Sequence, residues 1–306
     1  MRDAFIRSIY KATKQNNNVL CLVGDIGAYL LRNYIKDFPE NFYNLGAAEA
    51  NMIGVAAGLA MSGKIPFVYT ITTFVTVRCY EQIKDDVCYN NANVKLVGIG
   101  SGVSYGTMGS THHSLEDIAV MRALPNMVIF SPSDPLEVEE TIFAAMKYIG
   151  PTYIRLTLVS KPLDYDRGSF QIGRARMVKK GRDVAIIATG DMVAIALEAA
   201  KMLEKHKIDC HVVNMHTIKP IDEALVKKLS RECKAIISIE EHSTIGGLGS
   251  AIASVLSQYS KSKALFKIMG FDDVFCKEYS KDKLKILQKY GLSAHHVVQA
   301  IRKLYL

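Results

Sequence analysis

Short apolar runs alternate with amphipathic stretches along the first half of the chain. The apolar runs have the length and flanking turn residues of buried strands, and they lie at 19–25, 65–74, 94–102, 126–134 and 151–158. Helical periodicity is found at 3–15, 75–90 and 135–149. Because the connections are short, this alternation predicts a doubly wound, mainly parallel α/β sheet.

The second half repeats the alternation on a smaller scale. Residues 161–180 are charged and turn-rich, which predicts an interdomain linker. Further strands are expected at 181–190, 209–216 and 234–242, and further helices at 192–206 and 246–256. We therefore predict two α/β domains, at 1–160 and 181–306, the second with about four or five strands.

Composition is that of an ordinary globular protein, with 49% apolar and 22% charged residues. The net charge is +8, but the lysines are dispersed, so we expect a solvated basic surface and no nucleic-acid binding. We also expect a cytoplasmic protein that does not enter membranes, because no apolar run of about 18 residues and no secretion leader occurs. The six scattered cysteines are expected to be reduced core thiols.

One stretch, FYNLGAAEANMIGVAAGLAMSG at 42–63, has Glu49 as its only charged residue. It predicts a short buried strand, a turn at Gly46, and a buried helix whose small residues let another helix or a flat ligand approach the backbone. A lone carboxylate in apolar surroundings can hold and return a proton near neutral pH. The alternative is a first-turn glutamate that complements the helix dipole.

Other polar residues are expected at the mouth of the first sheet. Asp25 ends the first strand, and ligands gather at the carboxyl ends of parallel strands. The polar, glycine-rich loop at 103–117 contains His112 and His113, of which one is expected to face a ligand. A solvated histidine beside a helix cap made by Ser114 is the alternative.

Arg155 lies within an apolar strand, where a lone guanidinium needs an anionic partner. A ligand and a structural ion pair both satisfy that need. Nucleotide-binding loops are not expected, because GDIG at 24–27 and GGLG at 246–249 lack the dinucleotide spacing and no GxxxxGK[ST] occurs. For GGLG we expect close packing of a helix on the second sheet.

Several motifs follow one another in the order found in transketolase. They include NLGAAEANMIGVAAGLA, TTFVTVRCYEQIKDDV, GSTHHSLEDIAVMRALPNMVIFSPSD and EEHSTIGGLGSAIA. Over nearly its whole length the chain resembles the C-terminal subunit of split, two-chain transketolases, within the thiamine-diphosphate-dependent superfamily. The resemblance implies a pyrimidine-binding domain followed by a transketolase C-terminal domain.

The resemblance also implies which residues contact the cofactor. In that family a glutamate at the position of Glu49 hydrogen-bonds N1′ of the aminopyrimidine and promotes the tautomer that removes the C2 proton of the thiazolium. Phe74 matches the aromatic residue that stacks on the pyrimidine, and Ile71 and Val77 occupy neighbouring positions. Asp25 matches an acidic residue beside the cofactor.

Three residues match the family's substrate site. His112 matches the histidine that contacts the sugar near the reacting carbons. Arg155 and, more weakly, Arg2 match arginines that hold the substrate phosphate. The resemblance therefore implies a sugar substrate with an anionic group.

Three other positions depart from the family pattern. Met108 replaces an acidic residue that recognises a donor hydroxyl, and Gly100 replaces a histidine that contacts phosphate. Tyr29 replaces a serine that also helps to hold phosphate. Cofactor activation is kept while sugar-phosphate recognition changes, so we predict transfer of a ketol unit with an atypical or modified sugar.

The family's Gly-Asp-Gly…Asn segment, which holds Mg²⁺ and the diphosphate, is not found in this sequence. The resemblance therefore implies an N-terminal transketolase-like partner subunit and an α2β2 assembly with active sites between subunits. Two alternatives stay open. One is the β subunit of a decarboxylating 2-oxo acid or deoxyxylulose-phosphate synthase-like enzyme, and the other is a non-catalytic scaffold subunit.

Overall fold

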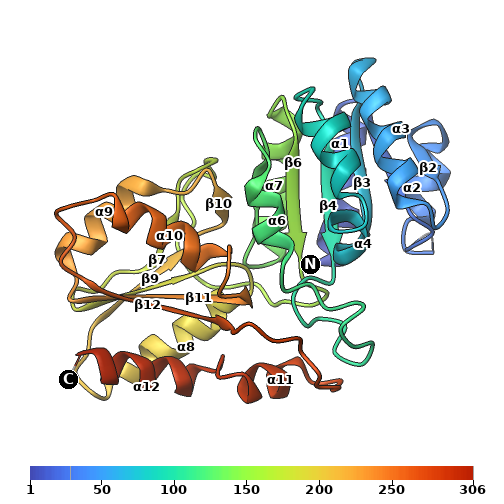
Figure 1. Cartoon of the computed structure of the whole chain (residues 1–306). Helices are drawn as coiled ribbons and strands as arrows, with labels where there is room; N and C mark the ends of the chain where they lie inside the picture. Colours follow the sequence, from blue (N-terminus) through green and yellow to red (C-terminus); the bar gives the residue numbers. More distant parts are fainter. Residues whose placement is uncertain (28, 306) are drawn as a thin grey trace.

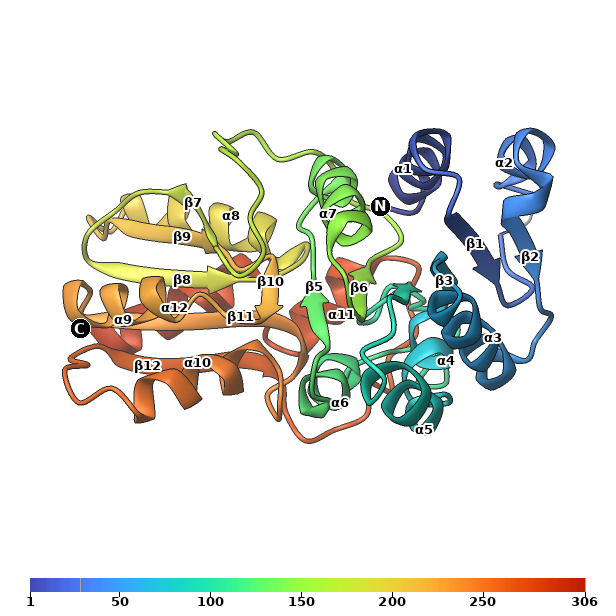
Figure 2. The ribbon, with the colours of Figure 1, turned by 90° about the horizontal axis from the view of Figure 1, so that it is seen from above.

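Two mainly parallel sheets lie side by side in the computed structural model, which describes residues 1–27 and 29–305 (Figure 1). The first has seven strands in the order β10-β5-β6-β4-β3-β1-β2, and the second has five in the order β12-β11-β8-β9-β7. Seen from above, helices cover both faces of the first sheet (Figure 2). The predicted fold class is therefore confirmed.

The first sheet is built mostly from the N-terminal half. Its strands are β1 (Val19–Val23), β2 (Phe42–Asn44), β3 (Ile65–Ile71), β4 (Lys95–Ile99), β5 (Val128–Phe130), β6 (Thr152–Leu156) and β10 (Thr217–Lys219). Its helices are α1 (Arg2–Gln15), α2 (Arg32–Asp37), η1 (Pro39–Asn41), α3 (Glu49–Met61), α4 (Thr72–Thr76), α5 (Tyr80–Gln82), η2 (Ile83–Cys88), α6 (Asp117–Ala123) and α7 (Pro135–Lys147).

The second sheet follows the same scheme. Its strands are β7 (Arg176–Lys179), β8 (Val184–Ala188), β9 (Cys210–Asn214), β11 (Ala235–Ser243) and β12 (Leu265–Phe271). Its helices are α8 (Met192–Glu204), α9 (Glu223–Glu232), α10 (Leu248–Ser257), α11 (Lys283–Lys289) and α12 (Ala294–Tyr305). The strand β7 lies inside the stretch 161–180 that the sequence predicts as a linker, and it pairs antiparallel with β9.

Two local predictions were wrong. The strand β2 is an edge strand with partly exposed residues, so it is not buried. The helix predicted at 75–90 is divided into α4, α5 and the π-helix η2. Its first turn is rich in β-branched residues, and the Thr76 hydroxyl donates to the Thr72 carbonyl at 2.7 Å. Such bonding to the backbone competes with regular helix and bends it.

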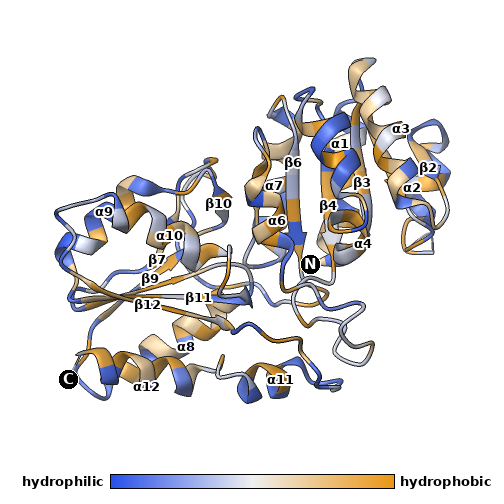
Figure 3. Cartoon of the chain, in the orientation of Figure 1, coloured by the Kyte–Doolittle hydropathy of each residue, from blue (hydrophilic) through white to orange (hydrophobic). Residues whose placement is uncertain are grey.

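Apolar side chains concentrate in the strands, while polar residues colour the outer faces of helices such as α9 (Figure 3). All six cysteines are buried free thiols, as predicted. The expected packing at GGLG is also confirmed, since a Cβ on Gly249 would lie 2.4 Å from Ile268 Cγ2. Among the described residues, no helix combines the length and apolarity needed to cross a membrane.

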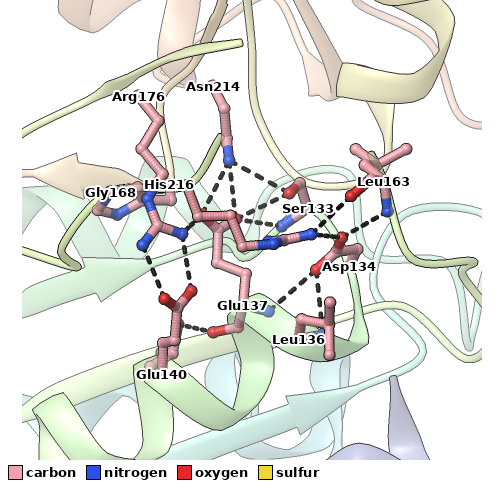
Figure 4. A network of polar contacts seen from close by, with 12 residues as sticks. Ser133, Asp134, Leu136, Glu137, Glu140, Leu163, Gly168, Arg176, Asn214 and His216 are labelled. Carbon is pink, nitrogen blue, oxygen red and sulfur yellow. Dashed lines mark hydrogen bonds and ion pairs between the residues drawn. The ribbon is translucent and has the colours of Figure 1, made fainter. Parts of the chain in front are cut away.

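A buried polar network joins the two sheets (Figure 4). The carboxylate of Glu137, on α7, accepts hydrogen bonds from the Ser133 amide, from Arg176 at the start of β7 and from Asn214 at the end of β9. Strand β10 also crosses over to pair with β5. Because the network is buried and a strand from the second half of the chain completes the first sheet, the second domain is a fixed support for loops at the edge of the first.

Candidate active site

The predicted site residues follow neighbouring strands of the first sheet. Asp25 comes after β1, Glu49 after β2, Phe74 after β3, and Gly100 after β4. These strands are parallel and in matched register, with Val23 opposite Tyr69 and Ile71 opposite Ile99. Their carboxyl ends therefore meet at one edge, the place where ligands bind in open α/β sheets.

Glu49 is the first residue of α3, and it is only 3% exposed. A Cβ added at Gly24 would lie 3.5 Å from Glu49 Cγ, so the β1 turn passes close to this side chain. The sequence predicts a carboxylate without a charged neighbour, and that expectation was wrong. Arg78 Nη1 donates to Glu49 Oε2 at 2.7 Å.

Arg78 also lies over the ring of Phe74, with its guanidinium carbon 4.1 Å from the ring centroid. One half-exposed cation thus connects the buried carboxylate to the aromatic face. The sequence analysis missed Arg78. The available signal was its position four residues after Phe74, which allows both side chains to lie on one side of the segment.

His112 continues this row of side chains. Its ring makes edge contacts with Phe74, at 5.3 Å between centroids, and with Tyr105, at 5.8 Å. Its Nδ1 is 3.0 Å from the Thr111 hydroxyl. The structure therefore orders Glu49, Phe74, His112 and Tyr105 along one rim.

His113 points elsewhere, as expected for one of two adjacent histidines. It is 3% exposed and lines a cavity of about 190 Å³ together with Cys276 and Glu116. Burial lowers its pKa below the ordinary value. Of the pair, only His112 borders Phe74.

The second domain holds the loop that carries Tyr105 and His112. The Val103 amide donates to Glu241 at 2.8 Å, the Ser280 amide donates to the Gly106 carbonyl at 2.9 Å, and the Ser110 hydroxyl donates to the Cys276 carbonyl at 2.8 Å. Lys283 pairs with Glu241 behind the loop. These contacts come from three segments of the second domain, so the loop position depends on the interdomain arrangement.

Gly100 and Tyr105 compete for the same space. Gly100 has φ +80°, and a Cβ built on it would lie 2.0 Å from Tyr105 Cε2. The Tyr105 ring thus covers the end of β4 and leaves no room for a side chain at position 100. Tyr105 is a second residue that the sequence analysis missed, because the contact depends on how the loop folds back.

We expect a double-mutant cycle to detect this steric contact. Gly100→Ala should destabilise the chain through backbone strain and overlap, and Tyr105→Ala should relieve the overlap alone, giving a coupling energy of about 1–3 kcal/mol. The coupling energy is measured by urea denaturation of the wild type, the two single variants and the double variant. Gly63→Ala is the matched control, because Gly63 has φ +86° with open space around it. A coupling below about 0.5 kcal/mol would contradict the contact.

The remaining predicted residues differ in their exposure. Asp25 is exposed with φ +52°, and Asn44 Nδ2 donates to its carboxylate at 3.1 Å. Ile71 is half-buried at the end of β3, and Val77 and Met108 are about half exposed, at 49% and 51%.

Tyr29, which replaces a phosphate-holding serine of the family, and Arg2, expected to hold the substrate's anionic group, both lie near the surface. Tyr29 is largely exposed, and its hydroxyl accepts from Arg32 at 3.3 Å. Arg2 is the first residue of α1, partly exposed, and pairs with Asp3 at 3.2 Å. Arg2 lies close enough to Tyr105 for its charge to oppose the rise in the pKa of Tyr105 that burial causes.

Arg155 is part of the core. Its Nε donates to Asp117 Oδ2 at 2.7 Å, its Nη2 donates to the Glu241 carbonyl at 2.8 Å, and its side chain is only 2% exposed. Burial by itself would raise the pKa of Asp117. The interactions with Arg155, His242 and Tyr153 outweigh burial, so the pKa of Asp117 is lowered. The alternatives for Arg155 were a ligand and a structural ion pair, and the geometry is that of the ion pair. The phosphate contact that the family resemblance implies for Arg155 is corrected accordingly.

Two family models match the chain in succession. The model for the transketolase pyrimidine binding domain matches residues 1–158, and the model for the transketolase C-terminal domain matches residues 173–297. The chain belongs to the transketolase family. Its site lies in the part matched by the pyrimidine binding model, and the supporting contacts to the loop come from the part matched by the C-terminal model.

Similar proteins include single subunits of transketolases. One of them, a subunit of the apulose-4-phosphate transketolase of Actinobacillus succinogenes, is 38% identical over 97% of this chain and 96% of that protein. The 6-deoxy-6-sulfo-D-fructose transketolase subunit SqwH of a Clostridium species is 36% identical over 98% of this chain and 92% of that protein. A solved split-gene transketolase, described as an inactive beta4 tetramer, has a TM-score of 0.90 and 39% identity and covers 99% of this chain and 97% of that one.

The residues present fit the aminopyrimidine of thiamine diphosphate. A guanidinium is flat, cationic and donates N–H groups, and an N-protonated aminopyrimidine shares these properties. Arg78 already makes the two contacts that such a ring needs, an N–H donated to Glu49 and a position over the ring of Phe74. The buried carboxylate and the aromatic face therefore form a surface suited to this ring.

Proposed function

We propose that this chain is the C-terminal, or β, subunit of a thiamine-diphosphate-dependent transketolase that transfers a two-carbon ketol unit between sugars. The observation that carries the proposal is the buried Glu49 carboxylate beside the Phe74 ring at the carboxyl edge of a parallel sheet. A buried acid beside a flat aromatic surface is suited to controlling the proton of a bound heterocycle.

When bound, the cofactor supplies the nucleophilic carbon that carries the two-carbon unit. With the cofactor bound, Glu49 would hold a proton at the pyrimidine nitrogen and Phe74 would orient the ring, and Ile71, Val77 and Asp25 are proposed to help bind it. Packing of the β1 turn at Gly24 keeps water away from the carboxylate. His112 donates hydrogen bonds to the reacting end of the sugar.

The diphosphate and most of the Mg²⁺ ligands are proposed to belong to an N-terminal partner subunit in an α2β2 complex. Two observations support this division. The matched models cover a pyrimidine binding domain and a C-terminal domain. The similar proteins of Actinobacillus and Clostridium are each named as one subunit of a transketolase.

The substrate is proposed to be an atypical or modified sugar. Met108 presents an apolar side chain where the family has an acidic residue. Tyr105 covers Gly100, the position at which the family has a phosphate-contacting histidine. The similar subunits of transketolases for apulose 4-phosphate and 6-deoxy-6-sulfo-D-fructose support this assignment. We propose that Arg2 binds an anionic group of the sugar.

The test is to purify the tagged chain with its cellular partner and to assay ketol transfer with thiamine diphosphate and Mg²⁺. We expect a partner of the N-terminal transketolase type and transfer from hydroxypyruvate to glycolaldehyde. Release of CO₂ from pyruvate without ketol transfer would assign the complex to the decarboxylating class. A chain that binds no partner and no cofactor would favour a scaffold function.

A further inference from the structure

Tyr105 lies at the end of the site rim that is farthest from Glu49. The contacts run from Glu49 through Arg78 to Phe74, from Phe74 to His112, and from His112 to Tyr105. If chemistry takes place near Glu49 and His112, the far end of an extended substrate passes Tyr105. This step rests on the proposed function.

The Tyr105 ring is held firmly in this place. Its loop is fixed by Val103, Gly106 and Ser110, which bond to the second domain on both sides of residue 105. Gly106 cannot carry a side chain, because a Cβ there would lie 2.3 Å from the Ser280 carbonyl oxygen. The Tyr105 backbone is therefore fixed by contacts with the second domain, and its ring packs over Gly100 and against His112 as a wall of the site.

The ring also determines which chemical group can reach the end of β4. It occupies the volume above Gly100, where a Cβ would lie 2.0–3.0 Å from Tyr105 carbon atoms. Burial raises the pKa of Tyr105, so its phenol stays neutral at physiological pH. A neutral phenol does not compensate the charge of a phosphate dianion as an imidazolium or a guanidinium does.

We propose that Tyr105 is a specificity-determining residue that shortens the substrate site at the end of β4 and disfavours ordinary ketose phosphates. Arg2, a partly exposed cation at the amino end of α1, remains for an anionic group that approaches from a different direction. The favoured substrates are sugars whose chain is branched or whose anionic group is displaced relative to that of an ordinary ketose phosphate.

The experiment compares two donors with the same acceptor in the complex of this chain and its partner subunit. Hydroxypyruvate loses its carboxyl group as CO₂ when its C1–C2 bond breaks, and D-xylulose 5-phosphate releases glyceraldehyde 3-phosphate when its C2–C3 bond breaks. In both assays the ketol unit forms its new bond to the carbonyl carbon of glycolaldehyde and gives erythrulose. Only the second donor has a distal phosphate, the group that the proposal places next to residue 105.

The readout is the ratio of kcat/KM for D-xylulose 5-phosphate to that for hydroxypyruvate, in which a general loss of activity cancels. We expect Tyr105→Ala and Tyr105→Leu each to raise the ratio by about tenfold or more, because they open the space above Gly100. Tyr105→Phe keeps the ring and should leave the ratio within about twofold. Tyr89→Phe, at an 86% exposed tyrosine outside the site, is the matched control.

The outcomes separate this inference from the proposed function. An unchanged ratio in Tyr105→Ala and Tyr105→Leu, with hydroxypyruvate still used, would overturn the role of Tyr105 and leave ketol transfer standing. A rise in Tyr105→Phe as large as in Tyr105→Ala would also overturn it, because the ring would not be the barrier. A wild-type complex that uses neither donor would overturn the proposed function and, with it, this inference.

Discussion

Glu49→Gln should lower ketol transfer by the reconstituted complex by about 10²–10⁴-fold, the range for loss of a positioned acid or base. Glutamine has nearly the same shape, and its amide oxygen can still accept the hydrogen bond that Arg78 donates. It cannot exchange a proton with a bound ring. The expected loss is therefore in kcat, and the melting temperature of the chain should change little.

The measurement is kcat with hydroxypyruvate and glycolaldehyde at saturating thiamine diphosphate and Mg²⁺. Glu198→Gln is the matched control, because Glu198 is exposed on α8 in the second domain. Glu49→Gln activity above about a tenth of wild type would contradict the assigned role. In that case Glu49 would be the first-turn glutamate that complements the dipole of α3.

Asp117→Asn should destabilise the chain by about 3–5 kcal/mol, the largest stability effect that we expect from a single polar substitution. Asp117 is fully buried, and its Oδ2 accepts from Arg155 Nε at 2.7 Å and from the Tyr153 hydroxyl at 2.6 Å. The asparagine keeps an acceptor but removes the charge. Arg155 is then left as a buried cation without its carboxylate partner.

Urea denaturation of the isolated chain measures this effect. Glu223→Gln is the control, because it breaks an exposed pair with Lys227 on α9 and should cost less than about 0.5 kcal/mol.

The pH dependence of the stabilisation by Asp117 has a definite sign. The folded pKa of Asp117 is lowered, so its stabilisation is present above its ordinary value of 3.8 and is lost as the pH falls through the folded pKa.

The difference between wild type and Asp117→Asn should therefore shrink as the solution is acidified below about pH 4. A cost near 1 kcal/mol at neutral pH would show that Arg155 does not depend on this partner. The phosphate-binding role suggested by the family resemblance would then be open again for Arg155.

Several features of the site could be predicted from local sequence because their causes are local. Apolar runs bounded by turn residues mark buried strands, and in a parallel sheet their carboxyl ends must share one edge, which placed Asp25 and the loop at 103–117 at the mouth of the sheet. Glu49 stood out as the only charge in a small-residue helix. The buried position of Glu49 follows from that pattern and was confirmed.

Other features depend on pairs of residues that no local pattern relates. Glu49 and Arg78 are 29 residues apart, and Arg155 and Asp117 are 38 apart. Whether an arginine in an apolar strand contacts a ligand or a core carboxylate is decided by which helix covers its strand. For Arg155 the partner is Asp117, the first residue of α6, and the answer is the core.

The sequence by itself determined the α/β architecture, the position of Asp25 at the carboxyl end of a strand and the identity of the buried carboxylate. Only the tertiary structure decided that Tyr105 covers Gly100, that Arg78 links Glu49 to Phe74, and that the second domain holds the loop of His112. The physical reason is that hydrophobic periodicity is a property of neighbouring residues along the chain. Steric exclusion and ion pairing depend on distances across the fold, which are set once the sheets and their loops have packed.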